Sequence, residues 1–151
     1  MKYASQTSVS VEKSKGEIER ILARYGAQKF LYGYDQQEAV IMFTMNERHI
    51  KFSLPLPSKE DFKLTPSKKY ERHPDDIIKA WEQACRQKWR ALALSIKSRL
   101  EDIESGIDTF ENVFMSKIML PDGSTIGDYM SPQIEAVYKT GQMPQLLSWM
   151  K

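Results

Sequence analysis

Four positively charged residues recur along one stretch of the chain at steps of four and seven. Arg86, Arg90 and Lys97 are spaced to share one face of an α-helix, and Lys79, seven residues before Arg86, extends the row. Cationic side chains along one helix face can follow a phosphate backbone. The same spacing is also typical of a solvated helix face whose charges pair with acidic neighbours. Both interpretations stay open, and the first makes these residues candidates for nucleic-acid binding.

A second basic cluster lies in segment 58–73, which is polar and punctuated by proline. This composition predicts a long loop and the best candidate for a mobile segment. Lys68, Lys69 and Arg72 surround Tyr70 there. Basic residues around an aromatic ring suit a clamp on nucleic acid or on an acidic protein, although exposed loops also collect charge for solubility. The three cationic residues form the second set of candidates for nucleic-acid binding.

Alternate aromatic residues offer a different kind of contact. Phe30, Tyr32 and Tyr34 are spaced to lie on one face of a strand. On an open sheet face, Tyr32 and Tyr34 could stack on bases, as in proteins that bind single strands. On a covered face the same residues belong to the core, which is the commoner role of aromatic residues in strands. The two interpretations exclude each other for one face of the sheet.

The residue types that usually carry out catalysis or bind metal ions form no motif in this sequence. The chain has one cysteine, Cys85, and two histidines, His49 and His73, whose spacing does not match a zinc site. Cys85 lies between two tryptophans of a helical pattern, which favours a buried thiol over a nucleophile. Asp108 and Glu111 have the spacing of a helix capping box, which gives them a structural role. We therefore expect no enzymatic activity, no cofactor and no metal site.

The candidate residues must be positioned by a fold with both helices and strands. A short strand or extended lead-in is expected at 7–11. Ser14 and Glu17 then have the spacing of a capping box and open an apolar helical pattern that Gly26 ends. Three strands follow in the pattern, at 29–34, 39–45 and 49–54, the middle one apolar enough to be covered on both faces. The pattern predicts an antiparallel meander with the first helix packed on one face.

The second half of the chain reads as helical. A long helix is expected from Pro74 to about Ser105, with Gly106 as its end. At 1.5 Å per residue it would be about 45 Å long, which exceeds the width of a small sheet. Part of it should therefore pack on the C-terminal helices or on another chain, which allows a homo-oligomer. A short helix after Asp108 and helical segments between 126 and 141, restarted at 131–132, complete the pattern.

The fold class that follows is α+β. We expect a helix packed on a three- to four-stranded antiparallel meander, followed by a helical C-terminal half with one long helix. The 151 residues suit one domain. Its parts are an α/β part at 1–57, a loop at 58–73 and a helical part at 74–151.

Composition narrows the class of protein further. A hydrophobic fraction of 41% and a charged fraction of 28% are ordinary for a globular protein. The net charge of +2 is weak support for nucleic-acid binding, although local patches can still bind phosphates. A lone cysteine cannot form an internal disulfide, and no apolar run has the length of a membrane span. We therefore expect a cytoplasmic protein without a membrane partner.

Several segments of the chain resemble a family of small uncharacterised bacteriophage and prophage proteins. The likeness covers most of the chain and is carried by YASQTSV at 3–9, EQACRQKWRALAL at 82–94, LPDGSTIG at 120–127 and GQMP at 141–144. It is least clear in the loop after Leu56. The resemblance implies no catalytic residue. It implies a context: a phage accessory gene in DNA metabolism or in countering the host, acting in the host cytoplasm.

The C-terminal tail is apolar for a chain end. Leu146, Leu147 and Trp149 either dock on the domain or contact a partner. Two functions are therefore expected. The first is a non-enzymatic phage accessory protein associated with nucleic acid, with DNA as its partner. The alternative is a protein-interaction module that binds or inhibits a host or phage protein, such as a defence component.

Overall fold

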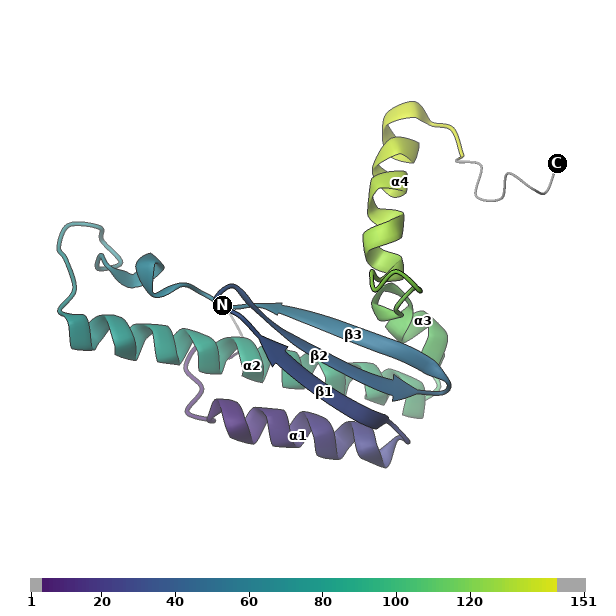
Figure 1. Ribbon diagram of the computed structural model, residues 1–151, viewed down its shortest axis with the longest axis horizontal. Helices are drawn as coiled ribbons and strands as arrows, with labels where there is room; N and C mark the ends of the chain where they lie inside the picture. Colours follow the sequence, from purple (N-terminus) through teal and green to yellow (C-terminus); the bar gives the residue numbers. More distant parts are fainter. Residues whose placement is uncertain (1–3, 144–151) are drawn as a thin grey trace.

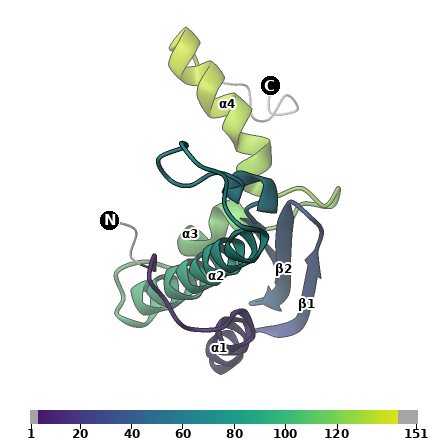
Figure 2. The same ribbon diagram turned by 90° about the vertical axis from the view of Figure 1, so that its left-hand side faces the viewer.

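The computed structural model describes residues 4–143 and has the expected α+β architecture (Figure 1). One layer is a three-stranded antiparallel sheet, and a layer of two helices covers one of its faces (Figure 2). A single core joins both halves of the chain, since Ile18 and Phe43 belong to the same buried cluster as Trp89 and Phe114. Within the described residues, no helix combines the length and the apolar character needed to cross a membrane.

The first helix, α1 (Val11–Arg24), begins four residues earlier than its capping pattern suggests. Its N-cap is Ser10, whose hydroxyl accepts a hydrogen bond from the Lys13 N–H at 3.1 Å. Ser14 instead lies inside the helix and is fully buried. Of the short strand or extended lead-in expected at 7–11, the strand is wrong, because residues 7–10 have no regular structure and the helix starts at Val11.

The sheet is the predicted meander of β1 (Gln28–Tyr34), β2 (Glu38–Met45) and β3 (Arg48–Pro55), in the order β1-β2-β3. The central strand β2 is covered on only one face. Its residues alternate between half-buried and buried, and Ile41 and Phe43 point into the core under the helices. The expectation of a strand covered on both faces is therefore wrong, and the face that carries Val40 and Met42 is open.

The long helix α2 (Pro74–Glu104) lies across the sheet and extends beyond it (Figure 1). Its overhanging N-terminal part is covered by the chain's own connection after β3, which includes a short 3₁₀ helix, η1 (Lys59–Phe62). The Trp81 indole N–H donates to the Pro57 carbonyl at 2.8 Å and fastens this connection to the helix. Part of the overhang of α2 is therefore covered by its own chain.

A short helix, α3 (Phe110–Phe114), and a 3₁₀ turn, η2 (Met115–Lys117), close one end of the core. Phe114 is fully buried and meets the rings of Phe43 and Phe52 edge to face, with centroids 6.4 and 6.2 Å away. Aromatic rings favour this arrangement. The N-cap is Thr109, whose hydroxyl accepts from the Asn112 N–H, so the N-cap predicted at Asp108 lies one residue too early.

The last helix, α4 (Ile126–Thr140), is one continuous helix that contains Pro132. The predicted restart at 131–132 is therefore wrong. Thr125 and Asp128 form a capping box at its start, and Gly141 ends it in the left-handed conformation, with φ at 68°. Figures 1 and 2 show α4 rising away from the sheet and the helix layer.

Candidate functional site

The basic row predicted along α2 does not point freely into water. The Arg90 guanidinium forms an ion pair with Glu17 of α1, and the two side chains are only 20% and 22% exposed. The Lys97 ammonium lies 3.7 Å from the other oxygen of the same carboxylate. Arg90 and Lys97 lower the pKa of Glu17, with the Arg90 hydrogen bond as the largest cause. Arg90 therefore joins α1 to α2, and its prediction as an outward-facing phosphate ligand is wrong.

Arg86 is also engaged within the molecule. Its guanidinium donates two hydrogen bonds to the Gln83 side-chain oxygen, at 2.6 and 3.1 Å. The Gln83 amide in turn donates to the Thr7 carbonyl at 2.9 Å, which ties the segment before α1 to α2. Lys79, near the start of α2, is exposed. The spacing did place the four residues on one helix, but Arg86, Arg90 and Lys97 make contacts within the molecule.

The predicted loop at 58–73 is folded. Leu64 and Glu71 form an antiparallel bridge, and the Arg72 N–H donates to the Lys63 carbonyl at 2.8 Å. The predicted long loop therefore contains η1 and a bridged hairpin, and most of its residues are exposed. Lys68 and Lys69 at its tip are exposed.

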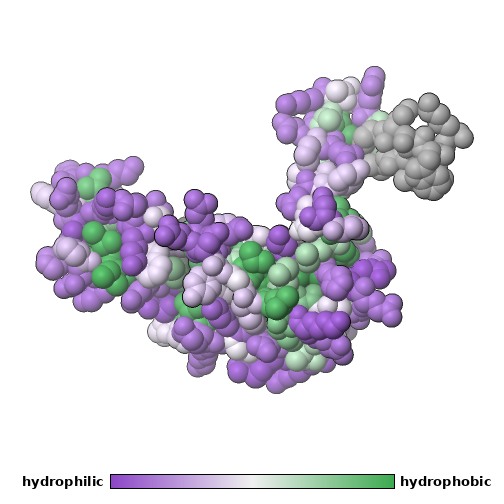
Figure 3. All heavy atoms as spheres, in the orientation of Figure 1, coloured by the Kyte–Doolittle hydropathy of each residue, from purple (hydrophilic) through white to green (hydrophobic). Residues whose placement is uncertain are grey.

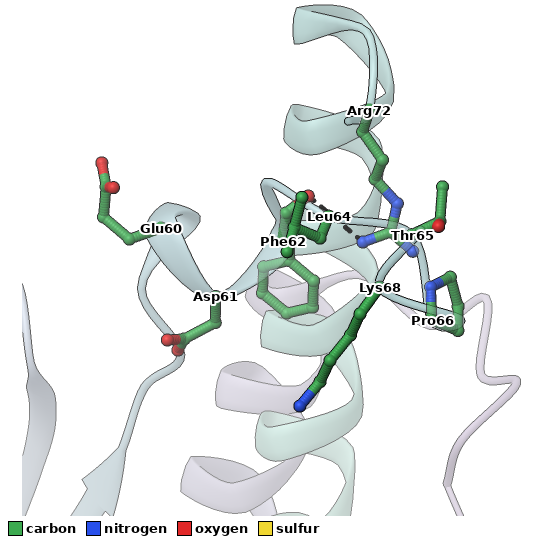
Figure 4. A pocket seen from close by; sticks show the side chains of 8 residues that line it. All are labelled: Glu60, Asp61, Phe62, Leu64, Thr65, Pro66, Lys68 and Arg72. Atoms are coloured by element: carbon green, nitrogen blue, oxygen red, sulfur yellow. Dashed lines mark hydrogen bonds between the residues drawn. The ribbon is translucent and has the colours of Figure 1, made fainter. Parts of the chain in front are cut away.

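A pocket of about 350 Å³ opens beside this hairpin (Figure 4). Arg72 donates to the Phe62 carbonyl at 3.3 Å, and its guanidinium lies 5.9 Å from the Phe62 ring centroid. The acidic Glu60 and Asp61 line the same pocket as Lys68 and Arg72. Because charges of both signs line its wall, the pocket is not a cationic cradle for phosphate.

Tyr32 and Tyr34 lie on the helix-facing side of the sheet, at its edge. Their partners in β2 are the buried residues Ile41 and Ala39. Burial and the neighbouring Glu19 carboxylate raise the pKa of Tyr32 to about 12. The alternative in which the two tyrosines stack bases on an open sheet face is therefore wrong, because the open face is the opposite one.

A pocket of about 250 Å³ lies beside the two tyrosines, between α1, β1 and α2. Trp89 and Lys15 line it, and the Lys15 ammonium lies 4.9 Å from the Trp89 ring and 5.9 Å from the Tyr34 ring. Cys85 borders the pocket as a buried thiol whose pKa is raised, chiefly by burial. A raised pKa keeps this thiol protonated, which does not favour a nucleophile. In residues 4–143, no three His, Cys, Asp or Glu side chains form a group that could hold a metal ion.

Two apolar surfaces of the described chain, which we had not predicted as sites, face solvent. The first is the open sheet face, where Leu31, Val40 and Met42 lie side by side in the register of β1 and β2. Figure 3 shows hydrophobic residues gathered over this face. The second is α4, which contains no buried residue within the described part of the chain.

The apolar residues of α4 form a row that we call the α4 stripe: Ile126, Met130, Ile134 and Val137. Steps of three and four place them on one face of the helix. Ile134 is 50% exposed, the other three residues are half-buried, and α4 contacts η2. The periodicity was visible in the sequence, but it carries no information on whether a neighbour covers the face.

The predicted contact residues of the tail, Leu146, Leu147 and Trp149, lie outside the described residues. Comparison of the whole chain with protein-family models, with curated proteins and with solved structures gave no match. The function must therefore be argued from the surfaces of this chain alone.

Proposed function

We propose that this chain is a protein-interaction module and that the α4 stripe contacts its partner. The observation that supports this proposal is a 15-residue amphipathic helix that projects from the body with no residue buried, within residues 4–143. Apolar surface in water is unfavourable by about 25 cal/mol per Å². A helix of this kind is typical of segments that lie in an apolar groove of another protein, with anchors at i, i+4 and i+7.

Nucleic-acid binding has less support from the structure. Arg86 and Arg90 are engaged in contacts within the molecule, and the pocket at 60–72 is lined by charges of both signs. The projecting helix carries Asp128, Glu135 and Lys139, so it is not a cationic element. The resemblance to phage proteins suggests a host or phage protein as the partner.

The proposal is tested by two substitutions that add the same charge to opposite faces of α4. Ile134→Asp places a carboxylate in the α4 stripe, and Ala136→Asp places one on the opposite face, where Ala136 is exposed. Neither residue is buried, so both variants should keep the thermal stability of the wild type. Affinity capture from host lysate should recover a stoichiometric protein with the wild type and with Ala136→Asp, and lose it with Ile134→Asp. Equal recovery by both variants would reject the α4 stripe as the contact.

A further inference from the structure

The strand β1 leaves one edge of the sheet open. The other edge, at β3, is partly covered, because Ile50 forms a bridge with Ile118 and the Met119 N–H donates to the His49 carbonyl at 2.7 Å. Within residues 4–143, no segment pairs with the outer edge of β1. All residues of β1 except Phe30 are exposed. An uncovered edge of this length is a template for another strand.

The direction of the backbone groups of β1 follows from its turn. The Asp35 N–H donates to the Glu38 carbonyl at 2.9 Å, so Asp35 faces β2. Because successive residues of an antiparallel strand alternate, Gly33 also faces β2, and the N–H and C=O groups of Tyr32 and Tyr34 point away from the sheet. These outward groups are free to pair with an added strand.

Side chains on both sides of this edge could select the added strand. On the helix side lies the pocket of about 250 Å³ with Tyr32, Tyr34 and Trp89 in its wall. Lys15 adds a positive charge there and Glu12 lines the same pocket, but within residues 4–143 neither side chain takes part in an ion pair. On the other side Leu31 is 60% exposed.

We propose that β1 binds an extended segment of a partner protein as a fourth strand. On the helix side, the segment places an apolar side chain in the pocket and a carboxylate at Lys15. On the opposite side, a second apolar side chain covers Leu31. Main-chain hydrogen bonds supply affinity in this mode of binding, and pockets for alternate side chains supply specificity.

A partner segment fits this edge better than a second copy of the chain. A two-fold axis at Tyr32 would set Lys29 opposite Asp35, which is favourable. It would also bring together the two Glu19 carboxylates, each of which lies beside a Tyr32. Like charges so placed disfavour the pairing. The inference rests on the proposed function in taking the partner to be a protein, but it uses a surface separate from α4.

The test uses displayed random peptides long enough to span β1, selected on the full chain. Selected peptides should alternate apolar residues and carry an acidic residue. Lys15→Glu should weaken the binding of a selected synthetic peptide roughly tenfold or more, because it replaces attraction to the acidic residue of the peptide by repulsion. Lys13→Glu, on the same helix, is the matched control and should change binding by less than about twofold. Tyr34→Pro, which removes an outward N–H, should weaken binding, whereas Tyr34→Ala should retain more of it.

Hydrogen exchange reports on individual backbone amides and therefore detects strand pairing directly. The bound peptide should slow exchange of the outward amides of Tyr32 and Tyr34, and leave the inward Gly33 amide unchanged. Recovery of no peptide, or binding that is insensitive to both Lys15→Glu and Tyr34→Pro, would overturn the inference. Peptide binding should be the same in Ile134→Asp, so failure at β1 and failure at α4 are told apart. Dimerisation of the free chain through β1, detected by sedimentation and abolished by Tyr34→Pro, would assign the edge to a second copy instead.

Discussion

Phe114 joins the C-terminal helices to the sheet, and its removal should destabilise the whole domain. The side chain is fully buried, and its ring lies between 5.3 and 6.4 Å from those of Phe110, Phe43 and Phe52. Phe114→Ala should lower the free energy of unfolding by about 3–5 kcal/mol, the usual loss for a buried phenylalanine. The upper part of that range is expected, because edge-to-face aromatic pairs add about 0.5–1.5 kcal/mol beyond the burial of area.

The loss is measured by urea denaturation followed by circular dichroism and tryptophan fluorescence. A thermal melt gives a second measure of the same loss. For a domain of this size, each kcal/mol shifts the melting temperature by roughly 2–4 °C, so the melting temperature of Phe114→Ala should fall by about 6–20 °C. Both probes should report one transition, because residues from both halves share the core. Met115→Ala at the next, exposed position is the control and should change stability by less than about 1 kcal/mol. A loss below about 1 kcal/mol for Phe114→Ala would refute the shared core.

Three further substitutions test local features of the structure. Glu17→Gln should destabilise the protein by about 1 kcal/mol near neutral pH. Since Arg90 lowers the pKa of Glu17, this stabilisation is present above the ordinary carboxyl pKa and is lost as the pH falls through the lowered value. Urea titrations should therefore converge in acid, and a constant difference at all pH values would contradict the ion pair. Gly127→Ala should displace α4 and lower the melting temperature, because a Cβ at this position would lie 2.9 Å from the Ser116 carbonyl oxygen. If the NMR chemical shifts of the α4 amides did not change, this result would argue against the contact. Ser14→Ala should raise the free energy of unfolding by about 1 kcal/mol, because the buried hydroxyl has no hydrogen-bond partner within residues 4–143. A loss of stability in a urea titration would show that the hydroxyl does form a hydrogen bond.

Local periodicity accounts for most of the fold. The alternation at 49–54 and the helical spacing after Pro74 predicted β3 and α2 closely, because one side of each element is buried against the same core. The start of α1 was misplaced because Ser10 and Ser14 both have N-cap chemistry. Burial of Ser14 is a tertiary outcome that local spacing does not contain.

The candidate site was harder to predict, since side-chain partners are distant in the sequence. Arg90 and Glu17 are 73 residues apart, and nothing near Arg90 indicates its partner. Spacing therefore placed the basic residues on one helix without showing that Glu17 neutralises part of the row. The residues of the α4 stripe recur at helical spacing in the sequence, but among the described elements it is chiefly η2 that contacts α4, near the start of the helix. The spacing of apolar residues shows which face of a helix needs a partner, but it does not show whether that partner belongs to the same chain.

Photo-crosslinking from α4 tests the proposed contact most directly. A photoreactive phenylalanine analogue at Val137 lies in the α4 stripe, whereas the same group at Glu135 lies on the polar face. In cells that contain the partner, the analogue at Val137 should give one discrete adduct with another protein, and the analogue at Glu135 should give none. The same adduct should form with a chain that ends at Met143. Equal adducts from both positions, or none from Val137, would contradict the proposal that this face of α4 binds a protein.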